Sequence, residues 1–125
     1  MGTTAATRFA TCERGASAVE FALVLPALAA LLVGGIYTGI LMYSAAGLHT
    51  AVEEAARCYS VNSSQCGSAS AAQTYAENQY YGMNTPTFIA SNQACGHQVS
   101  ATVTIAFTAV VTNVSVPLSA TACFP

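Results

Sequence analysis

A single uninterrupted apolar run constrains this chain more than any other feature of its sequence. No Asp, Glu, Lys or Arg occurs from Phe21 through Val52, and Phe21 to Leu48 consists mainly of Ala, Leu, Val, Ile and Gly. As one helix, those 28 residues would reach about 42 Å at ~1.5 Å per residue, against a hydrocarbon core of ~30 Å. The run is therefore predicted to span a bilayer once, over about residues 21–45, and to continue beyond it.

A cleaved secretory signal is the alternative interpretation of an apolar run near the N-terminus. Signals of that kind have an apolar core of roughly 7–15 residues, followed by a small-residue cleavage site. The run here is about twice that length, so a retained anchor is the preferred interpretation. Arg8 and Arg14 precede the span, and the positive-inside rule then leaves the N-terminus in the cytoplasm and the residues after the span outside.

The hydrophobicity changes along the chain in a way that predicts three segments. Residues 1–15 are polar and without periodicity, and we interpret them as a cytoplasmic leader. Residues 16–57 are predicted to form the N-terminal helix, with an extension to residue 57 on the outer side of the membrane. Residues 58–125 are predicted to form a small domain on that outer side.

The domain is predicted to contain one short helix and a small antiparallel sheet. Its composition indicates a loop over 62–68 and a helix from about Ser70 to Tyr81. Residues alternate between apolar and small polar types over 99–107 and again over 116–124, which is typical of half-buried strands, and a shorter apolar run covers 87–90. We therefore expect an α+β fold with a sheet of two or three strands.

Five cysteines indicate a domain that folds in an oxidising compartment. Cys12 lies in the leader, and the other four, Cys58, Cys66, Cys95 and Cys123, all lie on the outer side. Four cysteines allow three pairings, and local closure favours Cys58–Cys66 with Cys95–Cys123. Loop-closure entropy gives about 2.6 and 3.6 kcal/mol for these loops of 9 and 29 residues.

Composition and motifs argue against catalysis and against nucleic-acid binding. The net charge is −2 and no basic patch occurs. The chain also lacks Gly-x-Ser-x-Gly, His-Glu-x-x-His and a phosphate-binding glycine loop, so we expect no enzyme and no cofactor. Cys95 and His97 could form half of a metal site, and an anchored domain that binds a metal or another ligand is therefore the alternative function.

Two features of the apolar run point to contacts with other helices. Gly35 and Gly39 form a Gly-x-x-x-Gly pattern, which lets a second helix approach closely, although small residues are common in membrane helices generally. Glu20 stands at the start of the run, where a carboxylate is unfavourable and indicates a functional partner. A cut after Gly15 would create an amine at Ala16, and a neighbouring subunit could offer that amine to Glu20.

The stretch around Glu20 resembles a known family. Residues 14–26, RGASAVEFALVLP, are similar to the N-terminus of TadE-like proteins, the pseudopilins of the tight-adherence (Tad/Flp) branch of bacterial type IV pili. The likeness continues at Gly39 and in residues 51–57, AVEEAAR. It departs at Tyr37, where the family pattern leads us to expect an acidic residue.

The resemblance implies a minor, pilin-like subunit that helps to initiate or support assembly of the Tad/Flp pilus. It implies cleavage between Gly15 and Ala16 by a prepilin peptidase, and it assigns Glu20 and Phe21 to the alignment of neighbouring subunits. The implied partners are this peptidase, other Tad pseudopilins, the Flp major pilin and the inner-membrane assembly platform. The implied location is the bacterial inner membrane, with a cytoplasmic N-terminus and a periplasmic domain. The resemblance does not decide whether the subunit also enters the pilus.

Overall fold

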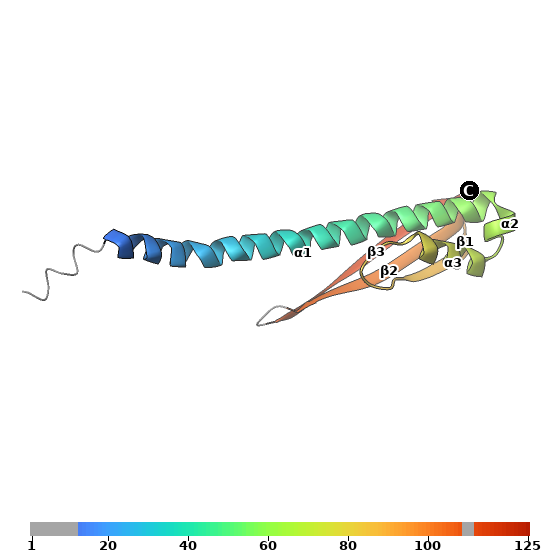
Figure 1. Cartoon of the computed structure of the whole chain (residues 1–125). Coiled ribbons are helices and arrows are strands. Elements are labelled where there is room, and N and C mark those ends of the chain that lie inside the picture. The colour runs from blue at the N-terminus through green and yellow to red at the C-terminus, as the bar shows by residue number, and fades with distance from the viewer. Residues whose placement is uncertain (1–12, 109–111) are drawn as a thin grey trace, which may run out of the picture. The chain divides into compact units, whose positions relative to one another are not determined.

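The computed structural model describes residues 13–108 and 112–125 (Figure 1). The elements are, in order, α1 (Glu13–Val61), α2 (Ser63–Cys66), α3 (Ala69–Gln79), β1 (Thr87–Gln93), β2 (Gly96–Thr108) and β3 (Asn113–Phe124). The chain divides into two compact units between Tyr37 and Thr38, so the boundary falls inside α1. The α+β class and the antiparallel sheet predicted from the sequence are confirmed, and the sheet has three strands.

Helix α1 is longer than the sequence indicates. It begins at Glu13 rather than near residue 16, contains Pro26, and continues to Val61 rather than ending at residue 57. The last turn stays helical because Tyr59 packs partly buried against the domain core. Asn62 then starts α2, because its side-chain oxygen accepts a hydrogen bond from the Gln65 backbone N–H (3.2 Å). The predicted loop over 62–68 thus contains one helical turn.

The C-terminal half of α1 supplies a large part of the domain core. Its buried residues recur every three or four positions, which places them along one stripe of the helix. They are Ser44, Leu48, Ala51, Val52, Ala55 and Ala56. The apolar members form one cluster with Ala72 and Ala76 of α3 and with the inner face of the sheet. Small side chains on both helices allow this close packing.

The three strands are antiparallel in the order β1-β2-β3 (Figure 1). The register places Ala90 opposite Val99 and Val99 opposite Ala122, so side chains at these levels share the face that packs on the helices. The buried residues of this face are Phe88, Ala90, Val99, Ala101, Val103, Ile105 and Ala120. The opposite face carries mostly Ser and Thr, as expected for a sheet with one face in solvent.

Two disulfides close the domain at the end of α1 and at the end of β3. Cys58 is bonded to Cys66, and Cys95 is bonded to Cys123, with Cα–Cα distances of 5.7 Å and 6.2 Å. This is the pairing that local closure favours. The same end of α1 is also joined to the last residue, because the Ser60 hydroxyl donates to the Pro125 carbonyl (2.6 Å).

Loss of the Cys58–Cys66 bridge is expected to destabilise the domain by about 2.6 kcal/mol, the loop-closure value for this cross-link. Cys58→Ser is the preferred variant, because it leaves the fully buried Cys66 side chain in the core. Urea unfolding of the full chain in detergent micelles, followed by tyrosine fluorescence, gives the free energy of unfolding. Val61→Ala is the control, since Val61 is 77% exposed and its truncation should change stability by less than ~0.5 kcal/mol. Equal effects of both variants would contradict the prediction.

Candidate functional site

The residues assigned to processing and subunit alignment lie at the start of α1. Gly15 and Ala16 are both within the helix, and Gly15 is exposed. Glu20 is exposed, and the Phe21 side chain is 65% exposed. The described part of the chain therefore leaves the carboxylate and the ring open to other molecules. Cys12, which the sequence places in the leader, lies outside the described residues.

The helix around Glu20 has an apolar surface that the described chain does not cover. Leu23 and Leu31, for example, are 74% and 75% exposed, and no residue of α1 before Ser44 is buried among those with a described side chain. By length and composition, α1 contains a segment apolar enough to cross a membrane. This is compatible with a single-pass membrane protein. In that setting an unpaired carboxylate is unfavourable by a few kcal/mol, so Glu20 needs a partner or a position close to the interface.

Two glycines of α1 offer a surface for another helix. A Cβ atom built at Gly35 or Gly39 would meet no atom within 4 Å. These glycines therefore do not make room for another element of the described chain, and the shallow surface at each is available to a second helix. At about 100° per residue, Gly35 lies only about 60° around the helix from Glu20, so a neighbour packed at Gly35 would approach the same side as the carboxylate.

The acidic segment near the end of α1 has one buried and one exposed side. Ala51, Val52, Ala55 and Ala56 are fully buried in the domain core. Glu53, Glu54 and Arg57 are exposed, so this side of the helix is solvated. Sequence reasoning missed the buried side, although the spacing of the four apolar residues was the signal that could have revealed it.

The cysteines and His97 do not come together as metal ligands in the described part of the chain. Cys95 is bonded to Cys123 rather than left as a thiol beside His97. The His97 ring instead contacts the Tyr59 ring, with centroids 4.2 Å apart. Among the described residues, no group of three or more His, Cys, Asp or Glu side chains is placed to hold a metal ion. The metal-binding form of the alternative hypothesis therefore has no ligand set among the described residues.

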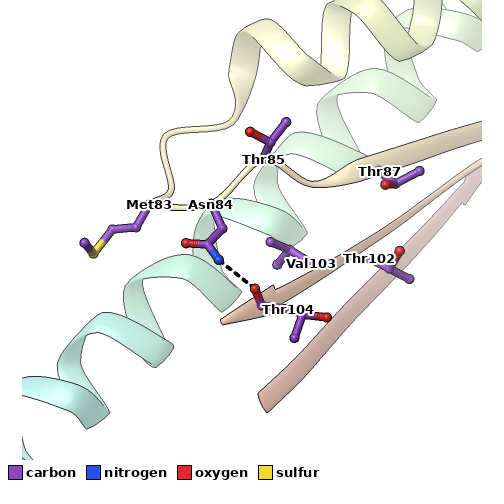
Figure 2. Close-up of a pocket in the computed structure, with 7 residues that line it drawn as sticks. All are labelled: Met83, Asn84, Thr85, Thr87, Thr102, Val103 and Thr104. Atoms are coloured by element: carbon purple, nitrogen blue, oxygen red, sulfur yellow. Dashed lines mark hydrogen bonds between the residues drawn. The ribbon is translucent and has the colours of Figure 1, made fainter. Parts of the chain in front are cut away.

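A polar hollow of about 480 Å³ lies where the chain enters β1 (Figure 2). Its lining is Met83, Asn84, Thr85, Thr87, Thr102, Val103 and Thr104. The Asn84 amide nitrogen donates a hydrogen bond to the Thr104 carbonyl (2.7 Å), which Figure 2 shows. This lining offers no carboxylate, imidazole or amine to act as a general acid or base. The hydrogen bond from Asn84 shows the direction in which the Thr104 carbonyl points.

Comparison with known proteins links most of α1 to one family. The family model described as "TadE-like protein" matches residues 15–57, about a third of the chain. No curated protein and no solved structure matches the chain. The matched segment begins at Gly15, includes the exposed Glu20, and ends at Arg57. Residues 15–57 are therefore a TadE-like segment, which supports a pilin-like protein associated with the Tad pilus.

Proposed function

We propose that this chain is a minor, pilin-like subunit that helps to initiate or support assembly of the Tad/Flp type IV pilus. It would act by binding other subunits rather than by catalysis. One observation carries the proposal: the TadE-like match starts at Gly15 and covers an exposed apolar helix with a single carboxylate near its start, Glu20. A helix that functioned alone would gain nothing from that carboxylate in a membrane.

In this proposal a prepilin peptidase cuts the chain between Gly15 and Ala16. The new amine of one subunit then pairs with Glu20 of a neighbour, which compensates the charge of both groups within the apolar layer. Phe21 and the glycine surface at Gly35 and Gly39 would pack against the neighbouring helix. The partners would be the peptidase, other Tad pseudopilins, the Flp major pilin and the inner-membrane assembly platform.

The proposed orientation has the N-terminus in the cytoplasm and the domain in the periplasm. Arg8 and Arg14 on the N-terminal side support it through the positive-inside rule. The two disulfides, Cys58–Cys66 and Cys95–Cys123, support it as well, because such bonds persist in the periplasm and are rare in the cytosol. Both observations support a location of the residues after the span on the outer side of the membrane.

The mature chain is expected to begin at Ala16. The full chain would be expressed in a bacterium with and without the Tad prepilin peptidase, and the intact mass of the membrane-extracted protein would be measured. With the peptidase present, the mass should fall by that of residues 1–15. Without it, the leader should remain.

A Gly15→Leu variant is the control for this cleavage, because a branched side chain at that position obstructs the close approach of the peptidase to the backbone. It should keep the leader even with the peptidase present. Recovery of an intact leader on the unchanged chain, or cleavage beyond residue 30, would contradict the proposed function.

A further inference from the structure

The two outer edges of the sheet differ in accessibility. On the β1 side, α3 packs against the strand, and Phe88 and Ala90 are only 5% and 8% exposed. A helix that covers an edge strand in this way prevents further strand pairing. On the β3 side, Ser119 and Thr121 are exposed, and within the described residues β3 pairs only with β2. The sheet thus has one covered and one open edge.

The hydrogen bond in Figure 2 shows which backbone groups of β3 point outward. The Thr104 carbonyl accepts from Asn84, so it faces the β1 side of β2 (Figure 2). Thr104 is opposite Pro117, which has no N–H to give to β2. Residues of β3 at alternate positions from Pro117 therefore direct their N–H and C=O groups away from β2. Beyond the proline these are Ser119, Thr121 and Cys123.

A groove runs along this part of the edge. It has a volume of about 370 Å³ and lies between Glu53, Glu54 and Arg57 of α1 and residues 121–124 of β3. Natural edge strands are usually protected by charged side chains, prolines or bulges. Residues 119–123 contain no charged residue and no proline, so this stretch lacks the first two of these protections.

We propose that the open edge at residues 119–123 binds an extended segment of a different polypeptide by strand addition. The backbone of that segment pairs with the outward N–H and C=O groups of Ser119, Thr121 and Cys123. Alternate side chains of an added strand point toward α1, where two carboxylates and one guanidinium form the wall of the groove. A Lys or Arg at such a position fits the net negative charge of that wall.

A second copy of this chain does not fit the edge as well. In the second copy the β1 edge is covered and β2 is central. Only β3 of the second copy could therefore pair with β3 of the first. Two β3 edges related by a two-fold axis run antiparallel, which would also make the two α1 helices run in opposite directions. This step rests on the proposed function, in which each α1 helix leads into a membrane span. Two α1 helices that run in opposite directions could not both enter the same membrane.

The test uses the full chain in lipid nanodiscs and a blocked seven-residue peptide of alternating threonine and lysine as the probe. Hydrogen exchange at single amides is measured by mass spectrometry. The peptide should slow exchange at Ser119, Thr121 and Cys123 by at least about tenfold, because each amide gains a hydrogen bond. Thr121→Pro removes one outward donor and leaves the β2 ladder intact, so it should abolish the protection at Ser119 and Cys123.

Ser115→Pro is the matched control. It also removes an outward donor of β3, but on the far side of Pro117 and outside the groove, so peptide protection should persist. Replacing both Glu53 and Glu54 by Gln should weaken binding of the lysine peptide, and a threonine–glutamate peptide should bind more weakly to the unchanged chain.

Three outcomes would overturn the proposal. The first is that the lysine peptide gives no protection, and the second is that protection persists in Thr121→Pro. The third is that the three amides are already protected without peptide and lose protection on dilution, which would identify a second copy as the occupant. None of these outcomes depends on cleavage after Gly15, so the proposed function is tested separately.

Discussion

Glu20→Ala is expected to abolish pilus assembly while leaving cleavage after Gly15 intact. The peptidase must recognise Gly15 and the start of α1, whereas the proposed partner of Glu20, the amine of Ala16 on a neighbour, exists only after cutting. Removal of one partner from a desolvated ion pair costs about 3–5 kcal/mol, which corresponds to a decrease of at least about 100-fold in subunit association. The variant should be at least as stable in the membrane, because an unfavourable carboxylate has been removed.

The measurements are intact mass for processing, co-purification with other Tad subunits, and counts of piliated cells. Glu20→Gln should behave as Glu20→Ala does, since the charge rather than the size of the side chain is required. Val19→Ala is the matched control, because Val19 is 61% exposed on the same turn and carries no charge. If Glu20→Ala is processed and supports normal piliation, Glu20 has no role in assembly.

Leu48→Ala is expected to destabilise the domain by about 3–4 kcal/mol. Leu48 is 1% exposed and lies in the core between α1, α3 and the sheet. Its neighbours in the helix stripe, Ala51 and Val52, are small and cannot fill the space that truncation leaves, so the loss of burial is increased by a cavity. Urea unfolding of the full chain in micelles, followed by tyrosine fluorescence, measures this change.

Met42→Ala provides the comparison within the same helix. Met42 is 69% exposed and about 1.7 turns from Leu48, so its truncation should change the free energy of domain unfolding by less than ~0.5 kcal/mol. Equal effects of the two variants, or no effect of Leu48→Ala, would show that α1 does not contribute to the domain core.

Much of the secondary structure could be predicted from the sequence because it leaves a local periodic pattern. The strand alternation over 99–107 and 116–124 corresponds to β2 and β3, and the run at 87–90 corresponds to β1, each extended by a few residues in the structure. The helix expected near 70–81 is α3, which ends at Gln79. The element boundaries differ because hydrogen-bond partners, not periodicity, decide where a strand or helix stops.

The candidate site was also accessible from the sequence. Gly15 and Glu20 stand out because conformational freedom and charge are unusual at the start of an apolar run, and that contrast needs no tertiary information. Phe21 was assigned only through the family resemblance. The cysteine pairing was predictable for a related reason: each bridge closes a short segment, and short loops close at the smallest entropic cost.

A long apolar helix with an ionisable residue near its start, a small sheet and a preferred pairing of four cysteines could all be predicted from the sequence alone. Only the tertiary structure showed that the buried stripe of α1 begins at Ser44, since residues 44–50 contain no Asp, Glu, Lys or Arg and do not indicate which side of the helix will be covered. Only the strand order, together with the packing of α3 on β1, showed that β1 is covered and that residues 119–123 of β3 are open beside Glu53 and Glu54. The physical reason is that pairing and covering join residues far apart in the chain, and such contacts leave no periodic mark on either partner.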